Sequence, residues 1–330
     1  MSKKIYRVCA IAKDEAPYLA EWVFHHHYFG FESIVVYVNR TTDTSLEVLR
    51  RLSKRVPGLE YEVIDWVDFC GPQIGSKIQT IAYAKDIARC KDLSVDYWLP
   101  LDIDEFWVPS DFKSNIHDHV LSVSNGKDAI SYPWYCEIGY DLPFSVFTPE
   151  SRFHFGAHVK TLSPKPWESI KRVRIHCPKY FDLKVLNPSG SEAIFQKNRP
   201  QLLEKENIVK QSAYILHRMN RSETEYFAIL KKGQPKSKND LKTNRSGYKG
   251  SKNSSRRKFN WPLLEYKNYI KARYEFMDGL SIDELVDIDK DKIKTKAGFV
   301  VERLISMSSG DAKDKLIARK LFSGTSHVNS

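Results

Sequence analysis

The 330-residue chain contains little cysteine, and its five cysteines are odd in number and far apart. None of them forms a C-x-x-C pair, so the sequence favours neither a zinc site nor a disulfide framework. A run of about 18 apolar residues is missing, which argues against a membrane-spanning helix. The N-terminal residues also lack the apolar segment of a signal peptide. The sequence therefore predicts a soluble, reduced protein located in the cytoplasm.

Glycine-rich phosphate-binding patterns are absent as well. The chain has neither G-x-x-x-x-G-K-S/T nor G-x-G-x-x-G, and no aspartate is followed at the right spacing by an acid and a threonine. These absences weaken two alternatives, a nucleotidyltransferase and a metal phosphohydrolase. Both stay open because both use paired carboxylates with a divalent ion.

The net charge of +11 indicates an anionic partner, and much of the excess lies in residues 236–258. That stretch has one acid, Asp240, and almost no apolar residues, so we interpret it as a flexible linker or surface loop. Peripheral contact with an anionic membrane at its inner face is a possible role. Nucleic-acid binding is the non-catalytic alternative, and we do not expect it because the stretch contains no recognisable reader motif.

The first 108 residues alternate between strand-like and helix-like segments. Helices are expected from Pro17 to Gly30, from Asp43 or Thr44 to Pro57, and over residues 76–90. This alternation predicts an α/β fold with a central, mostly parallel sheet flanked by helices. The strands are expected at Tyr6–Ala12, Ile34–Val38, Leu59–Ile64 and Tyr97–Leu101.

The remaining chain divides by composition. Residues 109–235 combine Pro-rich and aromatic loops with short strands such as Ile130–Tyr132 and Val173–His176. We interpret residues 1–108 as the nucleotide-binding half of one domain and residues 109–235 as its acceptor half. After the basic stretch, residues 259–330 form a helical C-terminal extension, with helices over Leu263–Met277 and from Ser281 onward.

Two acids follow the fourth predicted strand, in the string YWLPLDIDEFW. Ligands of a parallel sheet bind beyond the carboxyl ends of its strands, so Asp102 and Asp104 lie where chemistry is expected. At i, i+2 spacing on an extended backbone, both side chains would point to one side and hold Mg²⁺ or Mn²⁺ together with substrate phosphates. A second acidic cluster, Asp287 to Asp291, follows a predicted helix and is interpreted as a solvated turn.

The order of motifs along residues 5–233 resembles a bacterial glycosyltransferase family 2-like group. The matching strings are AIAKDEAPYLAEWVFHHHYFGFESIVVYVNRTTDTS, LDIDEFW, VKTLSP and LHRMNRSETEYFAILKKG. The group has the GT-A fold and carries E-W-(x)3-H-(x)3-G on its first helix and D-x-D-E-F after its fourth strand. The chain departs from this pattern at Asp14, Arg218, Arg221 and Thr224.

The resemblance implies a metal-dependent glycosyltransferase of the hexosyltransferase type, with a UDP-linked donor. The acceptor would be a glycan or a lipid-linked glycan in surface polysaccharide synthesis. His176 and His217 compete for the place of an additional metal ligand, and Lys160, Arg218 and Arg221 would add positive charge near the donor phosphates. The nucleoside would contact Ala12, Lys13, Asp14, Glu15, Asn39, Arg40 and Asp43.

Two residues of the nucleoside site also have a structural explanation. Glu15 is an acid at a helix N-terminus, and Asp43 is a candidate N-cap. If the reaction inverts configuration, a carboxylate must deprotonate the acceptor hydroxyl. Glu137, Asp141 and Glu150 are the candidates, and the sequence does not select among them.

Overall fold

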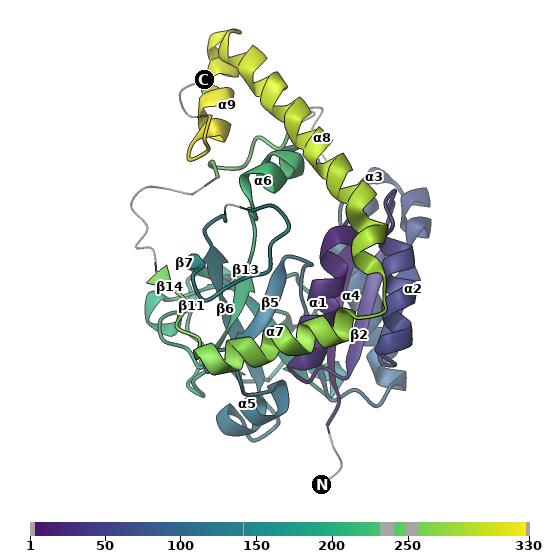
Figure 1. Ribbon diagram of the computed structural model, residues 1–330. Coiled ribbons are helices and arrows are strands. Elements are labelled where there is room, and N and C mark those ends of the chain that lie inside the picture. Colours follow the sequence, from purple (N-terminus) through teal and green to yellow (C-terminus); the bar gives the residue numbers. More distant parts are fainter. Residues whose placement is uncertain (1–3, 141, 232–240, 249–256, 328–330) are drawn as a thin grey trace. The chain divides into compact units, whose positions relative to one another are not determined.

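The computed structural model describes residues 4–140, 142–231, 241–248 and 257–327 (Figure 1). The chain forms two compact units. The first contains residues 1–135, 155–217 and 260–285, and the second contains residues 136–154, 218–259 and 286–330. The predicted boundaries at residues 108, 235 and 258 divide the chain into consecutive segments and not into compact units, and they stay a prediction.

Parallel strands form one half of the sheet in the first unit, in the order β3-β2-β1-β4. Helix α1 ends before Gly30, whose backbone φ of +91° favours glycine, as predicted. The predicted α/β class, with a central sheet flanked by helices and with helices near the C-terminus, is confirmed. The bounds are β1 (Tyr6–Ala12), α1 (Ala16–Tyr28), β2 (Ser33–Val38), α2 (Ser45–Arg55), β3 (Leu59–Val63), α4 (Ile78–Asp92) and β4 (Tyr97–Pro100).

The sheet continues past β4 with strands that no longer follow the parallel pattern, in the order β4-β7-β6-β13-β5. Strand β7 is antiparallel to β4, and β13 is antiparallel to β5. The latter register pairs His217 with Glu105. The bounds are β5 (Glu105–Pro109), β6 (Ala129–Glu137), β7 (Arg152–Pro164) and β13 (Ala213–His217).

Shorter elements join these strands. The predicted strand over Val173–His176 is wrong, because these residues lie in the connection between β8 and β9. Their local run of alternating residues is not paired with a neighbouring strand. The other elements of the first unit are η1 (Asp65–Phe69), α3 (Pro72–Gly75), α5 (Ile116–Val123), η2 (Trp167–Ser169), β8 (Ile170–Arg172), β9 (Lys179–Tyr180), β10 (Val185–Leu186), β11 (Phe195–Gln196), β12 (Arg199–Leu203), η3 (Lys205–Asn207) and α7 (Leu263–Met277).

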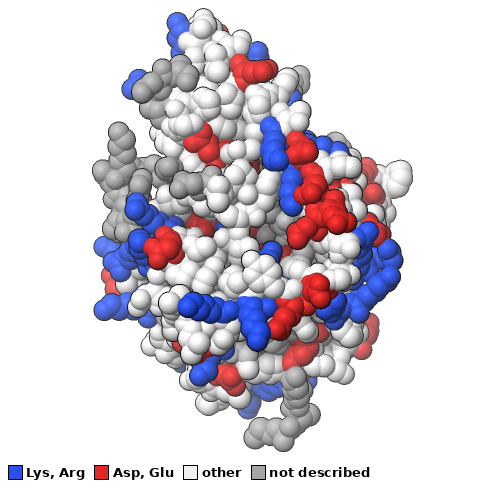
Figure 2. Space-filling view, in the orientation of Figure 1, with Lys and Arg blue, Asp and Glu red and all other residues white. Residues whose placement is uncertain are grey.

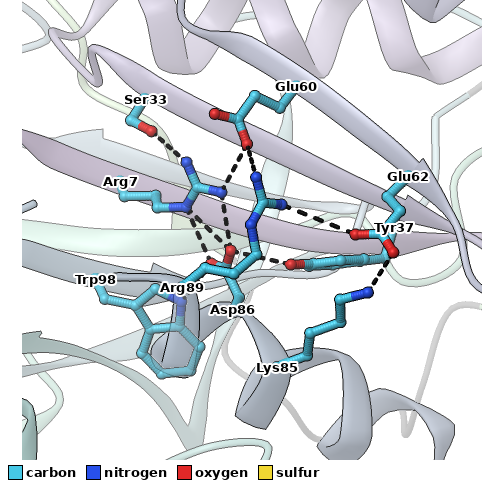
Figure 3. Close-up of polar contacts among 9 residues, drawn as sticks. All are labelled: Arg7, Ser33, Tyr37, Glu60, Glu62, Lys85, Asp86, Arg89 and Trp98. Atoms are coloured by element: carbon cyan, nitrogen blue, oxygen red, sulfur yellow. Dashed lines mark hydrogen bonds and ion pairs between the residues drawn. The ribbon is translucent and has the colours of Figure 1, made fainter. Parts of the chain in front are cut away.

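A buried ion pair connects α4 to the parallel strands (Figure 3). Asp86 accepts hydrogen bonds from Nε and Nη2 of Arg7, at 2.9 to 3.2 Å, and both side chains are fully buried. Tyr37 and Trp98 donate to the same carboxylate from β2 and β4. A buried carboxylate is tolerated only when it is paired and hydrogen-bonded in this way. The network therefore fixes α4 against three strands.

We expect Asp86→Asn to lower the free energy of unfolding by about 3 kcal/mol, because the amide cannot neutralise the buried Arg7. Urea denaturation of the purified protein measures the change. The matched control is Glu62→Gln on β3, which removes a partly exposed pair with Lys85 and should cost less than about 1 kcal/mol. Equal losses in the two variants would contradict a structural role for the Arg7–Asp86 pair.

The second unit has its own apolar core. It is built from α6 (Glu223–Leu230), the part of α8 (Ile282–Ser308) after Leu285, and α9 (Ala312–Phe322). Leu241 and Tyr248, which lie within the predicted basic linker, are buried in this core. Strand β14 (Arg257–Lys258) pairs with the start of β7. The described part of the basic stretch is therefore anchored by Leu241 and Tyr248, and the rest of it lies outside the described residues.

Helix α8 also corrects one prediction. Asp287, Asp289 and Asp291 were expected in a solvated turn, but they lie inside this helix. Each pairs with the lysine three residues later, a spacing that places both side chains on one helix face. Figure 2 shows acidic and basic side chains mixed along this part of the surface. Within the parts of the chain that the structure describes, no helix is both long and apolar enough to span a bilayer.

Candidate active site

The two predicted acids lie in a tight turn between β4 and β5. The amide of Glu105 donates to the carbonyl oxygen of Asp102 at 3.0 Å, which closes a four-residue turn. The expectation of an extended backbone at this point is therefore wrong. Asp102 is the first residue of the turn and Asp104 the third, so each side chain has its own set of neighbours. We call residues 102–105 the acid turn.

Lys160 on β7 pairs with two carboxylates of the acid turn. Its Nζ lies 3.0 Å from Oε2 of Glu105 and 3.4 Å from Oδ2 of Asp102. The side chains of Lys160 and Glu105 are fully buried, whereas that of Asp102 is 35% exposed. Burial alone would lower the pKa of Lys160, but its two acidic partners outweigh this and raise that pKa. Burial raises the pKa of Glu105 to about 7, against the opposing effect of Lys160.

The other oxygen of Asp102 faces helix α4. Gln79 donates its amide Nε2–H to Oδ1, and the hydroxyl of Tyr83 lies 3.4 Å from the same atom. Glu105 accepts the backbone N–H of Asp102 at 2.8 Å. Asp102 is thus held from three sides by α4, β7 and its own turn, and only part of its carboxylate faces solvent.

Asp104 faces a histidine instead. Its Oδ2 lies 3.5 Å from Nε2 of His217, which ends β13. The β13–β5 register places His217 directly opposite Glu105, the residue after Asp104. The centroid of the Trp134 ring lies 4.1 Å from that of the His217 ring, and the two ring planes are tilted by 55°. The arrangement brings one carboxylate and one imidazole together at the edge of the sheet.

This pair fits a divalent cation shared with a substrate. Neighbouring ligands of an octahedral ion at about 2.1 Å are about 3 Å apart, so a small movement places both Asp104 and His217 on one ion. Carboxylate oxygens suit Mg²⁺ and Mn²⁺. No group of three or more metal-ligating side chains was found among the described residues. The remaining ligands would be phosphate oxygens and water, as is usual for Mg²⁺ at phosphate sites.

His176, the competing ligand, has a different environment. Its Nδ1 lies 3.0 Å from the carbonyl oxygen of Val159, and its ring contacts those of Trp134 and His158. Burial lowers the pKa of His176 to about 4, with Lys160 adding to the effect. No contact between His176 and an acid of the turn is observed within the described residues, so of the two histidines only His217 directly faces an acid of the turn.

Helix α1 lies behind the acid turn. The indole Nε1–H of Trp22 donates to the carbonyl oxygens of Asp102 and Glu105, both at 3.0 Å. The imidazoles of His25 and His26 contact the backbone of Trp107, which follows the turn on β5. Burial lowers the pKa of both histidines, and that of His26 to about 3. His26 is thus a fully buried residue next to the strand that follows the acid turn.

The buried histidines make stability depend on pH. Their pKa is lower in the folded protein than the value of about 6.5 in the unfolded chain, so the unfolded chain binds more protons below about pH 6.5. Between pH 7 and pH 5 each should therefore cost about 2 kcal/mol of stability. We expect His26→Gln to reduce this loss by about 2 kcal/mol in urea denaturation at the two pH values.

The comparison variant is His27→Gln on the exposed side of the same helix, where burial also lowers the histidine pKa but less than at His26, so its loss of stability should change less. An unchanged difference between pH 7 and pH 5 in His26→Gln would mean that His26 is not held neutral in the folded protein.

The loops after β1 and β2 lie beside each other, as predicted for the nucleoside site. Oδ1 of Asp14 accepts the backbone N–H of Thr42 at 2.7 Å, and Oδ2 of Asp43 accepts that of Ala16 at 2.9 Å. Asp43 also accepts the N–H of Ser45, near the start of α2. These carboxylates therefore connect the two loops.

The other predicted nucleoside contacts lie at the same edge. Ala12 ends β1, and its carbonyl oxygen accepts the N–H of Asn39. Nδ2 of Asn39 donates to Asp65 of η1 at 3.3 Å. Lys13 is exposed, and Glu15 precedes the first turn of α1. The structure thus brings these residues together around the ends of β1 and β2.

The remaining predicted residues belong to the second unit. Arg218 and Glu137 form a buried ion pair, with Nε and Oε2 2.7 Å apart, and the guanidinium stacks on the ring of Tyr140. Arg221 is buried as well. Glu150 is exposed and pairs with Lys258 at 2.6 Å. Asp141 lies outside the described residues.

Several residues of the site were missed from the sequence. Gln79 and Tyr83 contact Asp102 from α4, and Glu105 is the buried partner of Lys160. Trp22 contacts the acid turn from α1. The helix residues show only ordinary amphipathic spacing, and Glu105 looks like a surface acid next to two others. The only available signal was that Glu105 is followed directly by an apolar strand.

Comparison with known proteins supports an assignment for the chain. The family model described as Glycosyltransferase family 92 matches residues 8–260. No protein with a curated description is similar enough to count as a match. The sequence resemblance is therefore supported for a glycosyltransferase, and not specifically for the family 2-like group.

Solved structures with a related chain path are distant. One is a mannosyltransferase from Pyrobaculum calidifontis in complex with GDP-Man and Mn²⁺, at 10% identity and a TM-score of 0.33, covering 96% of this chain and 79% of that one. Another is HddC from Yersinia pseudotuberculosis, complexed with GMP-PN, at 10% identity and a TM-score of 0.27, covering 82% of this chain and 100% of that one. Scores this low say nothing about what this chain binds.

Proposed function

Since the chain belongs to glycosyltransferase family 92 and is a glycosyltransferase, we propose that it transfers a hexosyl group from a nucleotide-diphosphate sugar to a glycan or lipid-linked acceptor. The observation that carries this proposal is the acid turn. One of its acids is held by a buried lysine, and the other faces a histidine at the carboxyl edge of the sheet. Diphosphate ligands of α/β proteins bind at such an edge.

The proposed chemistry follows from where charge develops. Transfer breaks the bond between the anomeric carbon and a phosphate oxygen, so negative charge accumulates on the leaving diphosphate. Positive groups beside that oxygen stabilise the transition state more than the bound donor. In this proposal Asp104 and His217 would hold Mn²⁺ or Mg²⁺, with Asp102 as the further predicted ligand, and the ion would supply Lewis-acid stabilisation of the leaving group. Lys160 holds Asp102 and Glu105 in place.

The nucleoside would bind at the ends of β1 and β2. Asp14 and Asp43 already accept backbone N–H groups from the opposite loop, so we assign them the task of shaping this site. Lys13, Glu15 and Asn39 are then the proposed direct contacts. By its sequence resemblance the donor is UDP-linked, and the product belongs to surface polysaccharide assembled on the cytoplasmic side of the membrane.

The general base stays a proposal among three residues. Glu137 would first have to leave its ion pair with Arg218, whereas Glu150 is exposed and pairs with Lys258 at the surface. Asp141 completes the set. Arg218 and Arg221 remain proposed phosphate contacts. The anomeric configuration of the product, determined by NMR, would show whether a base is needed.

A panel of nucleotide-sugars tested by thermal shift, with Mn²⁺ and with EDTA, would examine the proposal. We expect one donor to raise the melting temperature in Mn²⁺ and to lose that effect in EDTA. Slow hydrolysis should then release free sugar and nucleoside diphosphate. Release of a nucleoside monophosphate would instead indicate a phosphohydrolase, and the absence of any stabilising donor would contradict the proposal.

Nucleic-acid binding is less well supported by the described residues. The aromatic residues of the basic stretch and its end, Tyr248 and Phe259, are both buried. They are therefore not exposed for stacking on bases, which is how many single-strand binding proteins hold their ligand.

A further inference from the structure

The indole of Trp22 spans the acid turn from end to end. Its single N–H lies 3.0 Å from the carbonyl oxygen of Asp102, the first residue of the turn, and 3.0 Å from that of Glu105, the last. The side chain is fully buried in α1. We infer that Trp22 is a positioning residue, which attaches the acid turn to α1 and thereby sets the position of Asp104 relative to His217.

The hydrogen bonds of the turn explain why this contact matters. The carbonyl oxygen of Asp102 accepts both the indole N–H of Trp22 and the backbone N–H of Glu105. A carbonyl oxygen has two lone pairs, so both are used. Loss of the indole donor removes one of these bonds and also the buried bond to the carbonyl oxygen of Glu105, so the carbonyl oxygen of Asp102 keeps only the backbone N–H of Glu105.

The two histidines of α1 extend this attachment to the following strand. Nε2 of His25 lies 2.7 Å from the carbonyl oxygen of Trp107, so it must donate. Nε2 of His26 accepts the N–H of the same residue at 3.4 Å, while its Nδ1 donates to the carbonyl oxygen of Trp22 at 2.8 Å. The two consecutive histidines therefore bind both backbone groups of Trp107, its carbonyl oxygen and its N–H. The backbone on each side of Asp104 is fixed to one helix.

His217 reaches Asp104 from a different element. It ends β13, which pairs with β5, whereas the turn is attached to α1. The distance between Asp104 and His217 therefore depends on the β13–β5 pairing and on how firmly α1 holds the rest of the turn. The consequence for catalysis rests on the proposed function, because it requires that the two residues bind a cation together. Outer contacts of this kind change metal affinity by about 10- to 100-fold.

The first measurement compares Trp22→Phe with Trp167→Phe in the full chain. Trp167 is a matched control, because it is also buried and its indole donates to one backbone oxygen, that of Cys90, at 3.1 Å. The dissociation constant of Mn²⁺ alone is measured by electron paramagnetic resonance. We expect a rise of about tenfold in Trp22→Phe and less than twofold in Trp167→Phe. Equal constants for Trp22→Phe and the wild type would overturn the inference.

The second measurement does not depend on a metal. Hydrogen exchange of peptides covering residues 101–107 should become at least tenfold faster in Trp22→Phe and stay unchanged in Trp167→Phe. If the wild type binds no Mn²⁺, the proposed metal site is wrong, and exchange alone decides about Trp22. Unchanged exchange in the turn would overturn the attachment itself.

A third variant separates the hydrogen bond from packing. Site-specific replacement of Trp22 by its benzothiophene analogue removes the N–H and keeps the size of the ring. In this variant the amide hydrogens of residues 101–107 should exchange as fast as in Trp22→Phe. The variant also provides a folded comparison if the phenylalanine variant does not fold. Wild-type exchange in this variant would show that the ring, and not the N–H, holds the turn, and the inference would fail.

Discussion

Asp104→Asn is expected to lower kcat/KM for sugar transfer about a thousandfold, which corresponds to about 4 kcal/mol of transition-state stabilisation. The amide keeps the shape of the side chain but removes the negative charge that would hold a cation beside His217. Asp104 is partly exposed and is not the partner of Lys160, so the folded state should be little affected. Initial rates with the donor found by thermal shift measure the loss.

The same variant should also lose the Mn²⁺-dependent part of donor binding. Asp118→Asn, which changes an exposed acid on α5, is the matched control and should keep wild-type rates. If Asp104→Asn retained more than a tenth of the activity, or if the donor still stabilised it in a Mn²⁺-dependent way, the role assigned to Asp104 would be wrong.

The parallel half of the fold could be predicted because its signals are local. Apolar runs such as Tyr6–Ala12 and Ile34–Val38 are short, β-branched and separated by amphipathic segments, and each became a strand. The position of the two acids follows from the same reasoning, since they come directly after the fourth strand. The loops after β1 and β2 meet for the same reason, because parallel strands end at one edge.

The partners of the acids could not be predicted in this way. Lys160 lies on β7, and its pairing with Glu105 depends on the position of that strand next to β4 in the sheet. Nothing local distinguishes this lysine from an exposed one. The resemblance to other glycosyltransferases drew attention to Lys160 as a phosphate contact, but its actual neighbours are two carboxylates.

The errors also have physical causes. Alternation at Val173–His176 resembles a strand, but a strand needs a partner, and this segment has none in the described structure. The acids from Asp287 to Asp291 resemble a turn when they are counted alone. Each of these acids has a lysine three residues later, and this spacing indicates a helix.

Lys160→Met is expected to lower the free energy of unfolding by about 3 to 5 kcal/mol and to reduce activity strongly. It leaves Glu105 fully buried without its cation, which is the costly way to break a buried ion pair. Asp102 loses a charged partner at the same time. The control is Lys85→Met on α4, which removes a partly exposed pair with Glu62 and should cost less than about 1 kcal/mol.

The double variant Lys160→Met, Glu105→Gln separates stability from activity. A neutral pair removes the uncompensated charge, and glutamine still offers an oxygen to the N–H of Asp102, so at least half of the lost stability should return. Activity should not return, because Asp102 still lacks the cation that fixes its carboxylate. Recovery of both would mean that Lys160 serves only to balance Glu105. Recovery of neither would mean that its four-carbon stem, and not its charge, holds β7 against the acid turn.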